Sequence, residues 1–356
     1  MNLRRRQLLW AAGAAAVLPG CASAPAAGVP AAATPVIDLH SHAGRVIVSR
    51  DPAIGANRPF LPVAEPMRDG GVDLICLAIV TDTTVTRVSA DRRRFEPYRD
   101  PAAGELYALS QTEFARLDQL VQREKLNVVE RAGDLDTLRA RGPSVLVASE
   151  GADFLEGRIE RVDEAFRLHR LRLLQLTHYH VSEVGDIQTE APVHGGLSDF
   201  GAEVVKRCQS LGIVVDVAHG PYDLVKRVAS IATRPLVLSH TSLTGRPGPR
   251  SRQIGLEHAR LVAQTGGVIG VWPNAAIYPN LDAMAMGAKR LADAIGVDHV
   301  GLGTDMLGFI SPPVLGSYRQ VPAYAQALRV AGFTDDEVAK VLGGNALRVL
   351  HAGLPT

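Results

Sequence analysis

The stretch Val36-Ile37-Asp38-Leu39-His40-Ser41-His42 decides the fold that we expect for this chain of 356 residues. It is a short apolar run that ends in polar residues, and seven similar runs follow it. Short runs rich in β-branched residues, apolar on both faces, are typical of strands buried in a parallel sheet. The other seven runs cover residues 72–81, 145–150, 171–178, 213–219, 236–240, 267–272 and 299–305.

Amphipathic helical patterns lie between most of these runs. The clearest are Asp199 to Leu211 and Leu256 to Thr265, where apolar residues recur three and four positions apart. Eight alternating units predict an α/β fold, a closed (β/α)8 TIM barrel, with a doubly wound open sheet as the alternative.

One domain of residues 35–356 is expected to form this barrel. A long insertion near 91–140 follows the second strand; we expect it to be helical from Ser110 to Leu138 and to cover the barrel mouth. The tail from Val321 to Leu350 has the pattern of two closing helices.

The first 34 residues have the pattern of a targeting segment. Arg4-Arg5-Arg6-Gln7-Leu8-Leu9 and the short apolar run after it resemble a twin-arginine export signal. Leu18-Pro19-Gly20-Cys21 resembles a bacterial lipobox, which predicts a signal over 1–21, lipidation of Cys21 and an Ala/Pro-rich tether over 22–34. The alternative is an ordinary signal peptide cut near Ala24 or Ala27. Either way, we expect a protein of the bacterial envelope, periplasmic or lipid-anchored.

Composition and net charge indicate which classes of binding partner to expect. The formal net charge is +1, which gives no electrostatic reason to expect nucleic acid. The run Arg92-Arg93-Arg94 is expected on a solvated face, and Cys76 and Cys208 as buried free thiols. The expected partner is a small-molecule substrate, with a lipid anchor and a homodimer as the other associations that we allow for.

The functional prediction depends on where polar residues fall. Four of the runs end in histidine and two end in a carboxylate. A barrel of this kind carries its chemistry at the carboxyl ends of its strands, because the loops there meet at one mouth. The residues concerned are His40, His42, Glu150, His178, His219, His240 and Asp305.

A metal centre is the chemistry that this set favours. His40 and His42 are two residues apart on a strand, so both project to one face and can bind one cation, although an isolated His-x-His is more often a polar strand end. Glu150 has the type and place of a carboxylate that bridges two cations, and His219 and His240 can complete the second site. We therefore expect two divalent metal ions, and the ligand types favour Zn²⁺.

Two adjacent cations would lower the pKa of a shared water and hold it as a bridging hydroxide near neutral pH. Asp305, at the end of the eighth run, is placed to take the proton from that water and pass it to the leaving amine. The alternative for Asp305 is a structural carboxylate that caps the next helix.

From Val36 to Leu350, the chain resembles the membrane dipeptidase (renal dipeptidase) family of the amidohydrolase superfamily. The resemblance rests on an ordered set of motifs. They are Ile37-Asp38-Leu39-His40, Glu150-Gly151, Leu176-Thr177-His178, Gly195-Gly196-Leu197-Ser198-Asp199-Phe200-Gly201, Asp216-Val217-Ala218-His219, Ser239-His240-Thr241-Ser242, Gly266-Gly267-Val268-Ile269-Gly270-Val271, Gly301-Leu302-Gly303-Thr304-Asp305 and Leu342-Gly343-Gly344-Asn345-Ala346-Leu347-Arg348.

The resemblance implies roles for individual residues. His40 would ligate the first zinc, Glu150 would bridge, and His219 with His240 would hold the second zinc. His178 would contact the substrate and stabilise the tetrahedral oxyanion. Arg252 would bind the substrate's terminal carboxylate, with Arg250 as the alternative counterpart.

Two departures from the family pattern stand out. The family's first motif reads His-x-Asp, whereas this chain has His40-Ser41-His42, the pattern of the wider superfamily; His42 can ligate, but it is neutral where aspartate is anionic. After Asp305 the chain continues with Met306-Leu307-Gly308, where the family often has an aromatic residue, a second aspartate and glycine.

The expected function is thus a zinc-dependent metallopeptidase that hydrolyses dipeptides or similar small amides. An amidohydrolase acting on N-acyl amino acids, lactams or lactones is the second hypothesis. A lipid-anchored metal- or ligand-binding protein without catalysis is the third, and comes from a different class.

Overall fold

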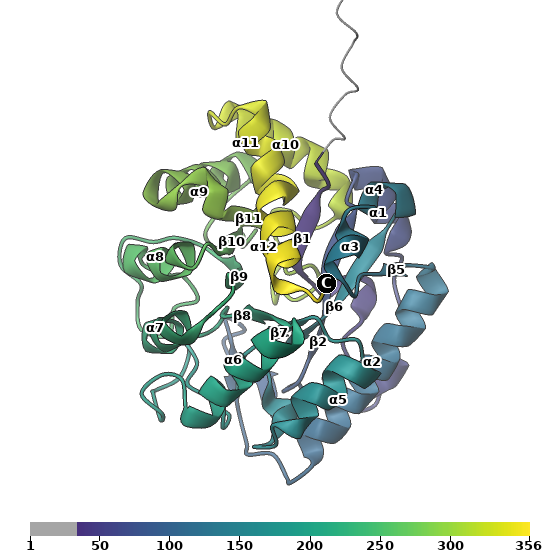
Figure 1. Ribbon diagram of the computed structural model, residues 1–356. Helices are drawn as coiled ribbons and strands as arrows, with labels where there is room; N and C mark the ends of the chain where they lie inside the picture. The colour runs from purple at the N-terminus through teal and green to yellow at the C-terminus, as the bar shows by residue number, and fades with distance from the viewer. Residues whose placement is uncertain (1–33) are drawn as a thin grey trace, which may run out of the picture. The chain divides into compact units, whose positions relative to one another are not determined.

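The structure is a computed structural model that describes residues 34–356. The predicted export signal, Cys21 and the tether up to residue 33 lie outside the described residues. Within them, eight parallel strands close into a barrel, which confirms the predicted (β/α)8 fold (Figure 1). The barrel closes because β1 pairs with β11 and β2 with β6. The strands, in order around it, are β1 (Ile37–Ser41), β2 (Leu74–Val80), β6 (Ser144–Glu150), β7 (Leu173–Gln175), β8 (Val214–Asp216), β9 (Val237–Thr241), β10 (Val268–Val271) and β11 (Val300–Leu302).

Each barrel strand lies inside one of the eight apolar runs or, for β6 and β9, extends beyond it by one residue, and every residue of these strands is buried. Burial on both faces explains why the runs are continuously apolar rather than alternating. The longest pairing joins β2 to β6 in register, from Leu74 beside Ser144 to Val80 beside Glu150. This register places Glu150 at the carboxyl end of the barrel, beside Val80 of β2.

Helices surround the barrel. α6 has the bounds that the sequence predicts, and it begins where the Ser198 hydroxyl accepts a hydrogen bond from the Gly201 N–H at 2.9 Å. The flanking helices are α1 (Ala64–Gly70), α2 (Glu105–Glu124), α5 (Glu160–Leu168), α6 (Asp199–Leu211), α7 (Tyr222–Ile231), α8 (Leu256–Gln264), α9 (Leu281–Ile295), α10 (Val321–Val330), α11 (Asp335–Ala339) and α12 (Asn345–Gly353).

The segment after β2 differs from the single helix expected between Ser110 and Leu138. α2 already ends at Glu124, because Lys125 adopts a left-handed conformation (φ 54°), and β5 (Asn127–Val128), α3 (Ala132–Leu135) and α4 (Leu138–Arg141) follow. α2 packs its apolar side, including Phe114 and Leu117, into the main core beside the strands. The element of this segment that reaches the mouth is instead the antiparallel hairpin of β3 (Thr86–Val88) and β4 (Phe95–Pro97).

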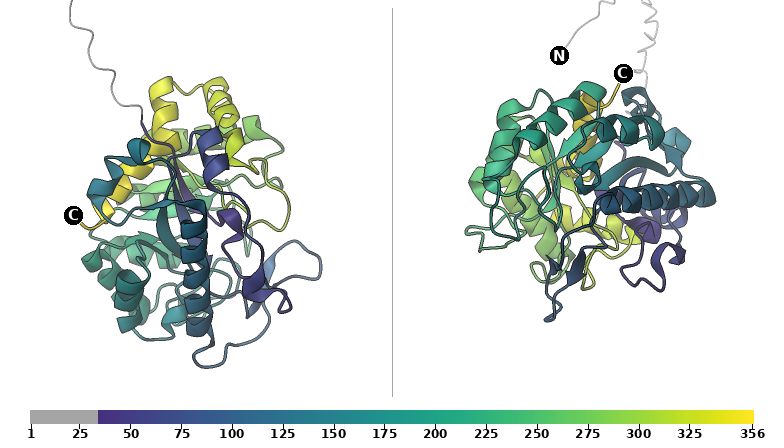
Figure 2. Two further views of the ribbon diagram at one scale, coloured as in Figure 1. Left: turned by 90° about the vertical axis from the view of Figure 1, so that its right-hand side faces the viewer. Right: turned by 90° about the horizontal axis from the view of Figure 1, so that it is seen from below.

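The two ends of the barrel have different covers. α12 packs Ala346, Val349 and Leu350 against residues near the strand starts, such as Leu74 and Val214, and so closes the amino end. Figure 2 shows α12 and the loops that follow β1 and β2 at opposite ends of the barrel. The functional residues must therefore be sought at the end away from α12.

Two further features concern the cysteines and the lengths of the helices. Cys76 and Cys208 are free and buried, as predicted. In the part of the chain that the structure describes, no helix has the length and apolar character needed to cross a membrane.

Candidate metal centre

The seven strand-end side chains singled out in the sequence meet at the carboxyl end of the barrel. Backbone hydrogen bonds join the first and last strands there: the Asp305 N–H donates to the His40 carbonyl and the His42 N–H to the Met306 carbonyl, both at 2.9 Å. These two bonds hold Asp305 beside both histidines of β1. The sequence thus brings residues 265 positions apart, from His40 to Asp305, into one site.

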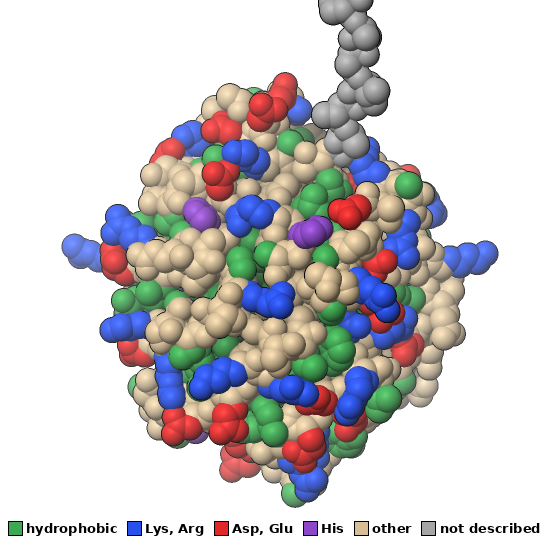
Figure 3. All heavy atoms as spheres, viewed as in Figure 1, with side chains coloured by type: hydrophobic (Ala, Val, Ile, Leu, Met, Phe, Trp, Pro, Cys, Tyr) green, Lys and Arg blue, Asp and Glu red, His purple; other side chains and the backbone are tan. Residues whose placement is uncertain are grey.

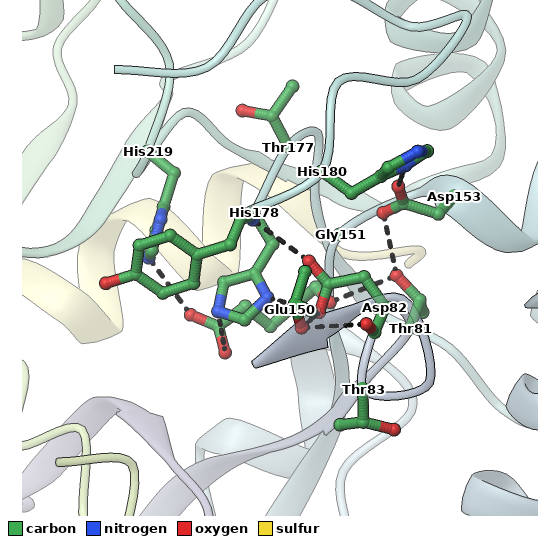
Figure 4. Close-up of polar contacts among 12 residues, drawn as sticks. Thr81, Asp82, Thr83, Glu150, Gly151, Asp153, Thr177, His178, His180 and His219 are labelled. Carbon is green, nitrogen blue, oxygen red and sulfur yellow. Dashed lines mark hydrogen bonds and ion pairs between the residues drawn. The ribbon is translucent and has the colours of Figure 1, made fainter. Parts of the chain in front are cut away.

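The Glu150 carboxylate is the centre of this site. Its two oxygens lie 3.1–3.5 Å from the Nε2 atoms of five histidines, and Figure 4 shows two of these contacts. Both the carboxylate and the five rings are buried. The five histidines are His40, His42, His178, His219 and His240.

The spacing of the ring nitrogens fits a cation. The Nε2 atoms of His40 and His42 lie 3.2 Å apart, and those of His219 and His240 lie 3.1 Å apart. Two imidazole lone pairs that face each other repel unless a proton or a metal ion lies between them. Nitrogen donors from histidine with carboxylate oxygens are the ligands that Zn²⁺ and similar divalent ions take in proteins.

Hydrogen bonds at the outer ring nitrogens orient two of these ligands. His42 Nδ1 lies 2.8 Å from the Ala78 carbonyl oxygen, so Nδ1 carries the proton and Nε2 faces the site with its lone pair. Ser239 Oγ lies 2.9 Å from His240 Nδ1 and can orient that ring in the same way. These partners fix the ring orientation that metal binding requires.

The possible ligand atoms fall into overlapping groups whose members lie within 4.8 Å of one another. One group combines His40 and His42 with Asp305, so Asp305 can also ligate in addition to the proton-transfer role predicted for it. Glu150 belongs to both of the other groups, in the bridging position expected for it. These other groups are His40, Glu150 and His240, and Glu150, His178 and His219.

Electrostatics favour an ionised Glu150 beside neutral His219 and His240. Burial alone would raise the pKa of Glu150, but the positive charge at His178 and His40 and the hydrogen bonds from the rings hold that pKa well below its usual range. Burial lowers the pKa of His219 and His240 well below normal, helped at His219 by the nearby Arg252 charge. Neutral imidazole and ionised carboxylate are the states that bind metal ions.

His42 has the opposite tendency. Burial lowers its pKa, but the hydrogen bond and charge of Glu150 and the charge of Asp305 outweigh burial and raise the pKa to about 9. The space between these two carboxylates therefore attracts positive charge, which is the condition for holding a cation there.

Asp82 is a residue of the site that the sequence analysis missed. Its Oδ1 lies 2.8 Å from His178 Nδ1, and its Oδ2 accepts a hydrogen bond from the Tyr179 N–H at 3.0 Å (Figure 4). Burial lowers the pKa of His178, but the Asp82 and Glu150 carboxylates outweigh burial, so the pKa is raised. The Asp82 carboxylate thus favours the protonated form of His178, in which the Nε2–H group can donate a hydrogen bond. The signal was available, because Asp82 comes directly after the second apolar run.

Asp305 is held on its other side by an aromatic residue. The Trp272 indole N–H donates to Asp305 Oδ2 at 3.1 Å, while Oδ1 lies 3.5 Å from His42 Nε2. Burial, as the main cause, raises the pKa of Asp305, which brings a carboxylate closer to the range useful for accepting and returning a proton. Gly308 keeps the space beside it open, since a Cβ there would lie 1.9 Å from Asp305 Oδ1.

Two site residues adopt a backbone conformation that is uncommon for residues other than glycine. His219 has φ 66° and Asp305 has φ 46°. Such conformations cost on the order of 1–3 kcal/mol and persist where the surrounding structure imposes them, most often at functional sites. His219 thereby contacts Glu150, and Asp305 lies beside His42.

A cavity of about 790 Å³ opens onto the ligands, and Arg252 lines it. The Arg252 guanidinium hydrogen-bonds to the Gln188 side-chain oxygen and lies 5.7 Å from the Trp272 ring. Its Nε and Nη2 atoms are buried without a hydrogen-bond partner among the described residues. Arg250 also reaches the cavity, but its side chain is 48% exposed and lies 3.7 Å from Glu190. Of the two arginines that the sequence left open, Arg252 is the one with donors free at the site.

Comparison with known proteins shows the family of this chain. The family model of the membrane dipeptidases (peptidase family M19) matches residues 31–353. Dipeptidase verJ of Clonostachys rogersoniana is 30% identical over 52% of this chain and 50% of its own length, and dipeptidase aclJ of Aspergillus oryzae is 31% identical over 51% and 44%. The alignments thus span about half the length of these relatives.

Solved structures share the fold. A metallopeptidase from Rhodobacter sphaeroides, liganded with a phosphinate mimic of the dipeptide L-Ala-D-Ala, superposes with a TM-score of 0.77 at 19% identity, covering 90% of this chain and 99% of the other. The probable dipeptidase PvdM from Pseudomonas aeruginosa gives a TM-score of 0.70 at 16% identity, covering 90% and 95%. Because the family model covers nearly all of the described barrel, this chain belongs to the membrane dipeptidase family, peptidase family M19.

Proposed function

We propose that this protein is a metal-dependent hydrolase that cleaves the amide bond of dipeptides or similar small amides. The observation that carries the proposal is the combination of one buried carboxylate shared by five imidazoles with an unpartnered arginine in the same cavity. The first feature suits a pair of divalent cations, and the second suits a substrate with a free carboxylate.

The residues proposed to hold the cations are His40 and His42 for one, His219 and His240 for the other, and Glu150 between them. We propose zinc as the metal because the donors are imidazole nitrogens and carboxylate oxygens. When bound, two such ions supply the Lewis acidity that lowers the pKa of a water molecule and polarises the amide carbonyl.

The chain's own residues then have distinct tasks in this proposal. Arg252 binds the terminal carboxylate through Nε and Nη2 and so places the amide over the ligands. His178, kept as a donor by Asp82, hydrogen-bonds to the carbonyl oxygen as negative charge develops there. Asp305 accepts the proton of the attacking water and gives it to the nitrogen of the leaving amine.

Arg252→Gln tests the proposal, with Arg250→Gln as the matched control two residues away. We expect Arg252→Gln to lower kcat/KM for a dipeptide by about 10- to 100-fold, the effect of losing a hydrogen-bonded charge pair. Turnover of the same dipeptide with a C-terminal carboxamide should change little, because that substrate has no carboxylate to bind. Arg250→Gln should leave both rates near the wild-type values.

The panel should include N-acyl amino acids, lactams and lactones, since these are the substrates of the alternative hydrolase. Unchanged dipeptide turnover in Arg252→Gln would reject the assigned role of the arginine. If zinc-loaded protein hydrolysed no small amide at all, the non-catalytic binding protein would be the better explanation.

We also propose that the chain is exported and works in the bacterial envelope. This rests on the twin-arginine pattern at Arg4-Arg5-Arg6 and on the lipobox-like motif that ends at Cys21. Both lie outside the described residues.

A further inference from the structure

Three consecutive arginines line the mouth of the active-site cavity. Arg92, Arg93 and Arg94 lie in the loop of the hairpin formed by β3 and β4, and all three contribute to the cavity wall. They are exposed, in keeping with a solvated run, but their position gives them a second property that the sequence does not indicate. They line the cavity that opens onto the ligands, together with the charged residues Arg50, Asp51 and Arg58.

The loop that carries them is held by its own hydrogen bonds. The Ser89 hydroxyl donates to Asp91 Oδ1 at 2.6 Å, and the Arg93 N–H donates to the same oxygen at 3.1 Å. The Ser89 N–H also donates to the Arg94 carbonyl at 2.9 Å. The Asp91 carboxylate is thus occupied within the turn, and the arginines are presented from an ordered backbone.

The positive charge of this loop is only partly balanced. Arg94 pairs with Glu96 at 3.1 Å, but Glu96 is shared with Arg87, which lies 3.2 Å away. Neither Arg92 nor Arg93 forms a salt bridge among the described residues. The negative charge nearest to Arg93 along the chain is that of Asp91, whose pKa is lowered by the hydrogen bond from Ser89 and also by the charges of Arg93 and Arg94. By contrast, basic and acidic side chains are interspersed over the face on which α12 lies (Figure 3). Unbalanced arginines at a cavity mouth attract anionic groups.

Aromatic rings connect the hairpin to the proposed metal ligands. The Tyr179 ring lies 4.8 Å from the His219 ring on one side and 5.2 Å from the Phe95 ring of β4 on the other. The His219 and Phe95 rings are therefore separated by at most about 10 Å. An extended chain covers about 3.5 Å per residue, so a dipeptide with a long side chain can reach from the ligands to the hairpin.

We propose that the preferred substrates carry an anionic group in addition to the terminal carboxylate, and that Arg92 and Arg93 bind it. The group is a carboxylate or a phosphate on a side chain of the dipeptide. This inference rests on the proposed function, since it concerns the substrate of the same site. Arg252 then binds one end of the substrate while the hairpin selects its side chain.

Isosteric substrate pairs test this proposal. The zinc-loaded protein is assayed on Glu-Ala against Gln-Ala and on Ala-Glu against Ala-Gln, with phosphoserine-Ala against Ser-Ala to separate phosphate from carboxylate. We expect kcat/KM to favour the anionic member of at least one pair by about tenfold, as two exposed ion pairs would give, and the preference to shrink as NaCl rises from 50 to 500 mM.

Replacing the arginines should remove that preference. In the double variant Arg92→Gln/Arg93→Gln, kcat/KM for the anionic substrate should fall about tenfold relative to the neutral one. Arg87→Gln is the matched control, since it removes an exposed arginine of the same hairpin that does not line the cavity. An equal change for both members of every pair, or the same loss of preference in Arg87→Gln, would overturn the proposal.

A binding measurement separates this proposal from the proposed function. Calorimetric titration of the zinc-loaded protein with glutamate and with glutamine needs no turnover. Tighter binding of glutamate that is lost in Arg92→Gln/Arg93→Gln would support the arginine site even if no dipeptide were cleaved. Equal binding of both amino acids, or tighter binding of glutamate that persists in Arg92→Gln/Arg93→Gln, would reject it.

Discussion

The inside of the barrel changes character along a single strand. In β6, Leu146 and Ala148 point into the barrel and join the apolar cluster that α12 covers, whereas Glu150, the next residue on the same side, lies among five imidazoles. The amino end is therefore a packed floor and the carboxyl end a charged mouth. Two residues along one strand separate the part that stabilises the fold from the part that serves chemistry.

The two ends of the barrel contribute to the free energy of folding with opposite signs. At the floor, burial of Leu74, Val349 and Leu350 stabilises the barrel by about 25 cal/mol per Å² of apolar surface. At the mouth, the left-handed backbone conformations of His219 and Asp305 lower stability by on the order of 1–3 kcal/mol each. Substitutions at the two ends should accordingly change different observables.

The largest effect is expected at the mouth, from Glu150→Gln. The amide keeps the size of the side chain but removes the charge that two cations would share, so metal content after dialysis should fall by at least one ion per chain. Dipeptide turnover should fall by about 10³-fold or more, since both Lewis acidity and water activation depend on the ions. Metal analysis and steady-state kinetics are the measurements, and circular dichroism checks that the barrel is intact.

Full metal content in Glu150→Gln would show that the carboxylate is structural. The contrast between the two ends would then lose its basis. Glu203→Gln, a neutralised glutamate on the exposed side of α6, is the control for a general effect of charge.

At the floor, Leu350→Ala should act on stability and leave the chemistry alone. Leu350 is fully buried on α12, so the cavity left by truncation should lower the free energy of unfolding by about 2–5 kcal/mol. kcat per folded molecule should stay at the wild-type value. Urea unfolding and active-site titration measure the two quantities, and Val330→Ala, 72% exposed on α10, is the control. A loss of kcat equal to that at the mouth would mean that the ends are coupled.

The same division explains what could be predicted from the sequence. All eight strands and the bounds of α6 follow from local apolar patterns, and the strand-end rule of barrels was enough to bring His40, Glu150 and Asp305 together. These features repeat at each strand, so local patterns determine them.

Contacts between neighbouring loops could not be predicted in the same way. The pairing of Asp82 with His178, the Trp272 hydrogen bond to Asp305 and the place of Arg93 at the cavity depend on loop conformations. The end of α2 at Lys125 was missed for a related reason: a left-handed lysine is uncommon, and the helical pattern continues beyond it.

The remaining effect concerns Glu113, a buried carboxyl group that is not one of the possible metal ligands. Glu113 on α2 accepts a hydrogen bond from the Val48 N–H at 3.0 Å, and burial raises its pKa to about 8 despite that bond and the nearby Arg116 charge. Because the folded state holds this proton more tightly than the unfolded state, stability is greatest below the unfolded pKa of 4.5 and falls as pH rises toward 8.

Glu113→Gln should remove that dependence, because the amide keeps the acceptor for Val48 and does not titrate. The slope removed is at most about 1.4 kcal/mol per pH unit. The free energy of unfolding of the variant should therefore rise relative to that of the wild type as pH increases from 5 to 8. Urea unfolding of the metal-free proteins at several pH values measures it, with Glu203→Gln as the exposed control. Parallel pH profiles for wild type and variant would mean that Glu113 is ionised in the fold, and that this buried charge is tolerated without the imidazoles that surround Glu150.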